Sequence, residues 1–168
     1  MKPYRIAICA WLGLVAAAFP LHASAFENEP KGFRGLDWDT PIESVQKQLI
    51  LIAGEGKETY YLRASDKLEI GDARLRDIVY RFYDGRFFGV VIRPARGNRD
   101  SFIEAFHALY GTGRKTNSDE VEYVWAGDDS EIILFCQDLV DECYAVVRST
   151  EVARRENAEE NKQTGAAN

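Results

Sequence analysis

A turn near the middle of the chain constrains the fold more than any other feature of the sequence. Asp84 and Gly85 separate two runs, 75–83 and 86–93, that are rich in aromatic and β-branched residues. Asp-Gly favours the type I′ turn that joins two antiparallel strands, so these runs predict a β-hairpin. The two-residue loop fixes the register, and the pairs expected on the core face are Phe82–Phe87, Tyr80–Gly89 and Ile78–Val91.

A second hairpin is predicted around two cysteines. The segments 131–136 and 143–148 are strand-like, and aligning Cys136 with Cys143 places aromatic beside aromatic, β-branched beside β-branched and acid beside base. The remaining facing pairs are Phe135–Tyr144, Ile133–Val146 and Glu131–Arg148. We expect a structural disulfide here. The alternative is a redox pair, but the cysteines lack the C-x-x-C spacing that lowers the pKa of a thiol.

A first helix is predicted after Thr40. The segment 40–43 (TPIE) places Thr at the N-cap, Pro at the first helical position and Glu three residues after the cap, which forms a capping box. Apolar residues then recur at helical spacing, and Gly54 and Gly56 end the helix. The residues expected on its buried face are Ile42, Val45, Leu49 and Ile50.

A second helix is predicted over about 100–110. Ser101 and Glu104 form a second capping box, and Gly111 suits the C-terminal end of the helix. The side expected to be buried carries Phe102, Phe106 and Leu109. His107 lies on the opposite side, so we expect it to face solvent.

The order of helix, strands, helix, strands predicts one α+β domain over residues 26–149. We expect an antiparallel sheet of five to seven strands with two short helices on one face. Residues 150–168 are polar and lack aromatic side chains, so they should form a frayed helix or be disordered. Two strand motifs echo each other, Ile78-x-Tyr80-x-Phe82 and Val121-x-Tyr123-x-Trp125. The echo is consistent with an internal duplication, but aromatic-rich strands of separate origin look the same.

Residues 1–25 have the three parts of a cleavable signal peptide. Lys2 and Arg5 precede an apolar run, 6–19, and small residues at Ala23 and Ala25 predict cleavage after Ala25. The run of about 14 residues is shorter than the roughly 20 that span a bilayer, although an uncleaved anchor is the alternative. We therefore expect a periplasmic or extracellular protein with no stable membrane span, in a compartment where cysteines oxidise.

Charge and motif content exclude several functions. The net charge of −6 becomes −8 without Lys2 and Arg5, because the leader holds no acidic residue. Binding to nucleic acid requires a basic surface, so we expect no such partner. Only His107 remains after cleavage, which leaves no second histidine for a zinc site or for a catalytic pair. We predict no catalytic residue, no metal and no cofactor.

Two groups of residues are candidates for binding. Arg93, Arg96 and Arg99 form a basic loop that can contact an anion, or that is simply a solvated connection. The outer face of the first hairpin combines rings with guanidinium groups, and Tyr and Arg are enriched at binding hot spots. Its candidate residues are Arg81, Tyr83, Arg86 and Phe88. The alternative is that the later strands or the C-terminal tail cover this face.

The segment 32–45 (GFRGLDWDTPIESV) resembles the opening of many small exported bacterial proteins of unknown function. It is also similar to the helix entry of the SmpA/OmlA outer-membrane assembly lipoproteins and of the β-lactamase-inhibitor-like fold. The resemblance implies helices packed on an antiparallel sheet and a Gram-negative envelope setting, and it carries over no catalytic residue. The chain departs from the pattern at Asp39, where Gly is usual, and it has no lipid-bearing cysteine after the apolar run.

These observations favour an exported, non-catalytic envelope protein that binds another macromolecule as an inhibitor, assembly factor or scaffold. The expected partner is an envelope protein or a cell-wall component. One alternative is an envelope hydrolase that cleaves cell-wall sugar through paired carboxylates, because the chain has many Asp and Glu residues that the fold could bring together. The other is a small-ligand carrier with a cavity under the sheet.

Overall fold

The computed structural model describes residues 26–116, 121–137 and 142–165. The predicted signal peptide and its cleavage position after Ala25 lie outside these residues.

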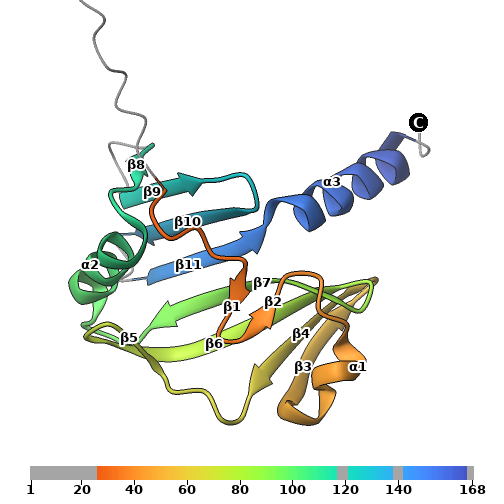
Figure 1. Ribbon diagram of the computed structural model, residues 1–168, viewed down its shortest axis with the longest axis horizontal. Coiled ribbons are helices and arrows are strands. Elements are labelled where there is room, and N and C mark those ends of the chain that lie inside the picture. The colour runs from red at the N-terminus through yellow and green to blue at the C-terminus, as the bar shows by residue number, and fades with distance from the viewer. Residues whose placement is uncertain (1–25, 117–120, 138–141, 166–168) are drawn as a thin grey trace, which may run out of the picture.

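A nine-stranded antiparallel sheet dominates the structure (Figure 1). Its strands are β3 (Leu49–Glu55), β4 (Glu58–Arg63), β5 (Glu69–Ile70), β6 (Ala73–Tyr83), β7 (Arg86–Pro94), β8 (Arg114–Lys115), β9 (Val121–Ala126), β10 (Ser130–Gln137) and β11 (Glu142–Ser149). The other elements are β1 (Gly32–Phe33), β2 (Leu36–Asp37), α1 (Ile42–Val45), the 3-10 turn η1 (Gln46–Gln48), α2 (Arg99–Tyr110) and α3 (Thr150–Gly165).

The mixed architecture with an antiparallel sheet agrees with the sequence, but the strand count does not. The main sheet has nine strands where five to seven were expected. One added strand is β3, a segment that the sequence assigned to the first helix. Another is β8, which has only two residues and too little sequence to give a pattern.

The strand order shows that the sheet consists of two halves with the same plan. The order is β3-β4-β6-β7-β11-β10-β9-β8, so each half is a helix followed by four strands that join the path, and the last strands of the halves meet. Residues 89–92 of β7 pair antiparallel with 145–148 of β11 at this junction. In this plan β6 corresponds to β10, and β9 corresponds to β4. The motif echo in the sequence therefore compares strands at different places.

The correspondence extends to the register of the β6–β7 and β10–β11 hairpins. In each hairpin an acid faces an arginine, followed toward the turn by an aliphatic pair on the core face and an aliphatic pair on the other face. The corresponding pairs are Asp77–Arg93 and Glu131–Arg148, Ile78–Ile92 and Ile132–Val147, and Val79–Val91 and Ile133–Val146. The two hairpins thus place the same residue classes at the same positions.

The first helix is much shorter than expected. Thr40 does not cap it, because its hydroxyl donates a hydrogen bond to the Asp37 carbonyl, and α1 ends at Val45. The chain continues through η1 into β3, so Leu49 and Ile50 lie on a strand. The prediction failed because a short apolar run fits helical and strand periods equally well.

The first hairpin forms around the predicted turn, but two bulges change its register, one at Phe88 and one at Arg76. Asp84 and Gly85 both have positive φ, 48° and 72°, as a type I′ turn requires. Phe82 faces Phe87 as predicted, but Phe88 is the extra residue of a β-bulge. Beyond the bulge the core-face pairs are Tyr80–Val90 and Ile78–Ile92, in place of Tyr80–Gly89 and Ile78–Val91.

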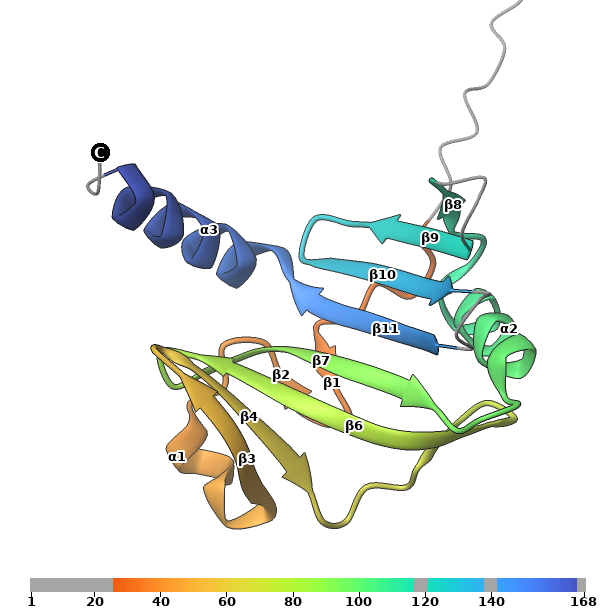
Figure 2. The same ribbon diagram turned by 180° about the vertical axis from the view of Figure 1, so that it is seen from behind.

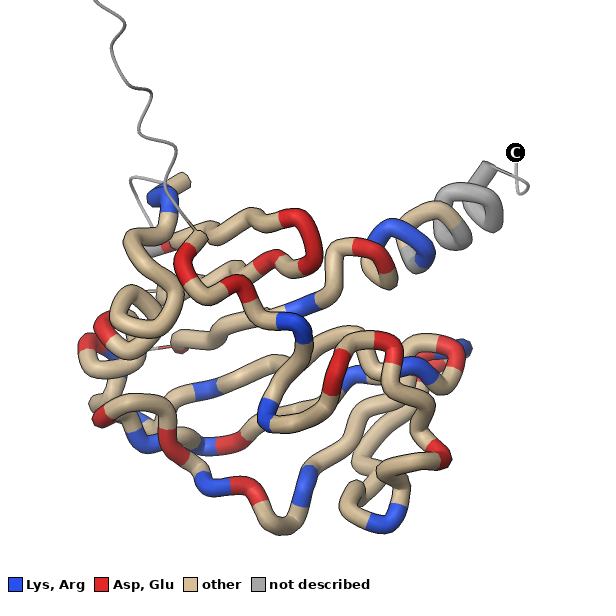
Figure 3. Tube along the Cα trace, in the orientation of Figure 1, with Lys and Arg blue, Asp and Glu red and all other residues tan. Residues whose placement is uncertain are grey.

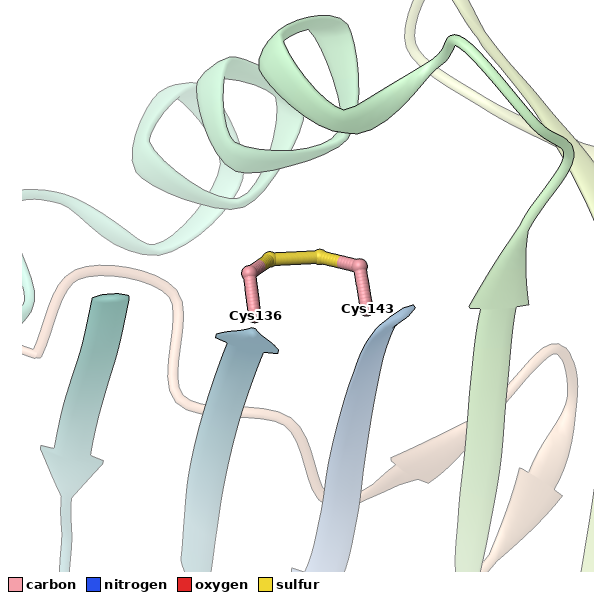
Figure 4. The surroundings of a disulfide bond; sticks show 2 residues. All are labelled: Cys136 and Cys143. Atoms are coloured by element: carbon pink, nitrogen blue, oxygen red, sulfur yellow. A yellow bond between two sulfur atoms is a disulfide. The ribbon is translucent and has the colours of Figure 1, made fainter. Parts of the chain in front are cut away.

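The disulfide hairpin forms in the predicted register. Cys136 lies opposite Cys143 and is bonded to it, and the bridge joins the ends of β10 and β11 beside α2 (Figure 4). The other three predicted pairs, Phe135–Tyr144, Ile133–Val146 and Glu131–Arg148, also face each other. Cys136 is fully buried within the main core cluster.

One face of the sheet carries the core. The segment 26–41, which we call the strap, runs across this face together with α2 (Figure 1). The largest buried core side chains are Tyr80, Phe82, Phe87, Phe102, Phe106 and Trp125. Seen from behind, the other face of β6, β7, β11 and β10 has no described element in front of it (Figure 2). We call this second side the open face.

Hydrogen bonds fasten the strap to both halves of the sheet. Glu29 Oε1 accepts from the backbone N–H groups of Asp129 and Ser130, both at 2.7 Å. The indole Nε1 of Trp38 donates to Ser130 Oγ at 2.7 Å. Arg34 donates to the carbonyls of the segment 67–69, so the strap contacts the first half as well.

The second helix ends at Tyr110 with Gly111 at its C-cap, as predicted, but its start and its buried side differ from the prediction. It begins at Arg99, so Ser101 lies inside the first turn and does not cap the helix. Leu109 is 41% exposed, although we expected it to be buried. His107 does not point into solvent: its ring is half-buried and packs 4.6 Å from the Tyr123 ring and 5.4 Å from the Trp125 ring. His107, rather than Leu109, therefore packs on the aromatic side chains of β9.

The polar C-terminal segment forms a helix from Thr150 to Gly165. Val152 and Ala153 are buried near the end of β11, and the rest of α3 extends away from the sheet (Figure 1). Among the described residues, no helix is both long enough and apolar enough to cross a membrane.

Candidate functional site: an arginine groove on the open face

The open face combines an apolar stripe with rows of charge. Val79, Val91, Val146 and Ile133 lie side by side across β6, β7, β11 and β10. On the two sides of this stripe, Arg93 faces Asp77 and Arg148 faces Glu131. Basic and acidic residues are interspersed along the strands and loops, as the charge-coloured trace shows (Figure 3).

A groove of about 550 Å³ lies at one end of this face, where β7 continues into α2. Its lining residues come from β6, from β7, the following loop and the first residue of α2, and from the start of β11. They are Arg76, Val91, Arg93, Pro94, Ala95, Arg96, Gly97, Arg99, Glu142, Cys143, Tyr144 and Val146. Four of the twelve are arginines and one is an acid, so the groove is basic in a chain with a net charge of −6.

Asp77 orients two of the four arginines. Arg93 Nε donates to Asp77 Oδ1 at 2.7 Å, and Arg76 Nε donates to Asp77 Oδ2 at 3.2 Å. The structure assigns neither arginine a second acidic partner among the described residues. Because each uses its Nε for Asp77, the planar end of each guanidinium retains donors that can bind another anion.

Backbone contacts hold the loop that carries Arg96 and leads to Arg99, the first residue of α2. The Ala95 N–H donates to the Arg74 carbonyl at 2.9 Å, and the Arg74 N–H donates to Asn98 Oδ1 at 3.1 Å. Asn98 also donates from Nδ2 to the Arg96 carbonyl. Gly97 turns the chain with a φ of 75°, in the left-handed region that glycine adopts without strain. The loop is therefore fixed to β6.

The floor of the groove is apolar and aromatic. Val91 and Val146 face each other across the junction of the two halves. Tyr144 is 37% exposed, and its ring centroid lies 5.5 Å from that of Phe135 on the neighbouring strand. Guanidinium groups around an apolar floor can bind a carboxylate or phosphate through charge-assisted hydrogen bonds while the floor contacts the carbon atoms next to it.

The structure brings together the three loop arginines that the sequence nominated for an anion contact. Arg93, Arg96 and Arg99 all line the groove. Sequence reasoning missed Arg76 and Tyr144, which reach the groove from other strands. Only the pairing of these strands with β7 brings them to the groove. Arg76 lies at a bulge in β6, next to Asp77, and Tyr144 follows Cys143 on β11.

The other nominated surface does not exist as one exposed patch. Phe88 is 0% exposed, and the Arg81 guanidinium lies over its ring at 4.6 Å while also pairing with Glu58. Arg86 extends to the strap, where Nη1 donates to the Asp39 carbonyl at 3.2 Å. Phe88 is therefore not exposed in the isolated chain: the bulge places its ring beneath the Arg81 guanidinium, and the Tyr83 ring centroid lies 6.3 Å from its own.

The ionisable groups of the core contact neighbours that give them structural roles. Tyr80 Oη donates to Asp66 Oδ2 at 2.8 Å, and burial together with this hydrogen bond raises the pKa of the tyrosine well above its usual value. Burial also raises the pKa of Tyr110. Within 26–116, 121–137 and 142–165, no group of three or more His, Cys, Asp or Glu side chains could hold a metal ion.

A second groove, of about 490 Å³, lies between the strap and the start of α3. Its acidic lining residues are Asp39, Asp128, Asp129 and Glu151. Arg155 pairs with Asp39 at 3.0 Å, so basic side chains neutralise part of this groove.

No family model matches the chain, and comparison with curated proteins and with solved structures also finds no match.

Proposed function

We propose that the chain is an exported, non-catalytic envelope protein that binds another macromolecule, as an inhibitor, an assembly factor or a scaffold does. The partner we propose is an envelope protein that places an acidic side chain in the arginine groove. The observation that carries the proposal is the convergence of four arginines on a sheet face that no described element covers. The face outside the groove would supply contact area to the same partner.

Two features support the export step of this proposal. Residues 1–25 have the composition of a cleavable leader, and the chain contains a bonded cysteine pair. Disulfides persist in oxidising compartments and are rare in the cytosol. Periplasmic or extracellular placement is therefore part of the proposal, and the predicted cleavage after Ala25 can be checked by N-terminal sequencing of the exported chain.

The charge distribution favours an acidic partner. The chain as a whole is acidic, so long-range repulsion should discourage most acidic proteins from binding elsewhere on its surface. Inside the groove Asp77 already orients Arg76 and Arg93, which reduces the entropy that these side chains lose when an anion binds. A hydrogen bond to a charged group contributes about 1.5–3 kcal/mol, enough for one arginine to change affinity tenfold or more.

The proposal is tested with the exported chain as bait in an envelope extract. Wild type should retain a defined partner, and the Arg96→Glu variant should lose it because a like charge enters the groove. Arg114→Glu is the matched control, since Arg114 is exposed on β8 at the far edge of the sheet. Titration of the recovered partner should show weaker binding as salt rises. The groove is not the site if Arg96→Glu and Arg114→Glu bind alike.

A cell-wall hydrolase is the second candidate, and the acidic second groove is the observation that favours it. Glycosidases need two carboxyl groups about 5–10 Å apart, and four carboxylates line this groove beside the Trp38 ring. Incubation of the protein with purified peptidoglycan should release no reducing ends under the binding proposal. Release by wild type, abolished in an Asp128→Asn/Glu151→Gln double variant, would replace binding with hydrolysis as the function.

A further inference from the structure

The two outer edges of the main sheet differ in a way that the binding proposal does not use. At one edge β8 has two residues, Arg114 and Lys115, both exposed. Short, charged edge strands are a common means by which native sheets avoid pairing with other molecules. At the other edge β3 has seven residues and pairs with β4 alone. Thus one edge is protected by charge and the other is not.

The unprotected edge is strongly apolar. Ile50, Leu51 and Ile52 are consecutive on β3 and are 53%, 59% and 48% exposed. They are half of the six large apolar residues that are exposed in the described part of the chain. Side chains from both faces of the strand are accessible, along with the outward backbone groups of an edge. A strand of this kind is expected to gain a partner strand.

We propose that this partner is β3 of a second copy, paired antiparallel about a two-fold axis near Leu51. The argument for a second copy is the charge distribution around the apolar residues. Lys47 precedes Leu51 by four residues and Glu55 follows it by four, and both are exposed. Lys47 lies in η1, two residues before β3 begins, and Glu55 is the last residue of β3. An antiparallel pair centred on Leu51 therefore places Lys47 of each copy near Glu55 of the other, twice per dimer.

The bulge in β3 limits the strength of this association. Leu51 faces Tyr61 on β4 and Ala53 faces Tyr60, so Ile52 is an extra residue that bends the strand. A bulge shortens the stretch over which a second strand can pair regularly. The dimer should therefore be reversible, dissociating on dilution, and it should extend the sheet across two molecules while leaving both arginine grooves accessible.

Sedimentation of the exported chain over a range of concentrations tests the proposal. Wild type should show a monomer–dimer equilibrium. Leu51→Lys should remain a monomer at concentrations at least tenfold above those at which wild type dimerises, because the two-fold axis places the new charges opposite each other. Leu68→Lys is the matched control, since Leu68 is 45% exposed but lies outside β3. Circular dichroism establishes that each variant folds. A wild-type monomer throughout, or a dimer that Leu51→Lys does not weaken, overturns the proposal.

A charge exchange tests the antiparallel arrangement independently. Lys47→Glu and Glu55→Lys should each weaken the dimer severalfold, and the double variant should restore it, because the exchanged charges again face each other. Oxidation of Leu51→Cys should give a covalent dimer on a non-reducing gel, and Leu68→Cys should not. Equal dimerisation of all three charge variants, or no cross-link through position 51, would exclude this pairing. Both outcomes leave the groove proposal intact, because Lys47, Leu51 and Glu55 do not line the groove.

Discussion

Arg93 and Arg148 occupy corresponding positions in the two halves of the sheet, and each hydrogen-bonds to the acid directly across from it. Arg93 Nε donates to Asp77 Oδ1 at 2.7 Å, and Arg148 Nε donates to Glu131 Oε2 at 2.9 Å. The difference between them is Arg76, which contacts Asp77 from the same strand. One half of the open face therefore has a basic excess, and the groove is at that half.

The two ion pairs should differ in coupling energy. A double-mutant cycle for Arg148→Ala and Glu131→Ala should give about 0.5 kcal/mol, the usual size for a partly exposed pair. The cycle for Arg93→Ala and Asp77→Ala should give less, because Asp77 keeps Arg76 as a partner when Arg93 is removed. Urea denaturation measures both cycles. At 1 M salt, where the Debye length is about 3 Å, both couplings should shrink; equal and salt-independent couplings would contradict this account.

Reduction of the disulfide should destabilise the protein. The bridge closes a short loop between Cys136 and Cys143, and a loop of this size contributes roughly 2–3 kcal/mol in the chain-entropy model. Urea denaturation with and without reductant should show a loss of this size in the free energy of unfolding. A Cys136→Ala/Cys143→Ala variant is the control, and reductant should not change its midpoint. An unchanged wild-type midpoint in reductant would show that the bridge is not stabilising.

Phe88 should be a structural residue and Tyr144 a binding residue. Phe88→Ala should lower the free energy of unfolding by about 3–5 kcal/mol, as for other buried rings. Tyr144→Ala should cost much less stability, because the side chain is 37% exposed, and it should weaken binding of the partner in the groove. Thermal denaturation and partner titration separate the two effects. If Phe88→Ala is as stable as wild type, the ring is not packed as described.

Tyr80 should make the protein sensitive to alkaline pH. Its pKa in the folded chain is raised above the ordinary value of 10.0 by burial and by its hydrogen bond to Asp66, so above about pH 10 the unfolded chain loses this proton first. The resulting stability is complete below pH 10 and declines as the pH rises. Tyr80→Phe should show a shallower decline, with Tyr110 responsible for part of what remains. Identical slopes from urea denaturation between pH 9 and 11 would exclude the effect.

The disulfide hairpin could be predicted in full because its signals are local and redundant. The aromatic, aliphatic, ionic and cysteine pairs all specify one register. The first hairpin has an equally clear turn, but nothing in the sequence marks Phe88 as the extra residue. Its bulge depends on how β7 packs between β6 and β11, which a single hairpin does not encode.

The candidate site was predictable only in part for a related reason. Arg93, Arg96 and Arg99 are neighbours in sequence, so their proximity follows from the loop itself. Arg76 and Tyr144 join them through the pairing of β7 with β6 and with β11, which spans more than 50 residues of chain on the β11 side. Likewise, Ile50 is exposed on an edge strand because tertiary pairing, rather than its apolar pattern, determines where the sheet ends.

The strap has a consequence for the order in which the molecule is completed. Glu29 accepts its hydrogen bond from Ser130, 101 residues further along the chain. At a synthesis rate of about 5–20 residues per second, the backbone N–H of Ser130 that donates to Glu29 is therefore made roughly 5–20 s after Glu29. The strap is thus made early but completes its contacts late, and until then the aromatic layer beneath it remains accessible to any chaperone that accompanies the emerging chain.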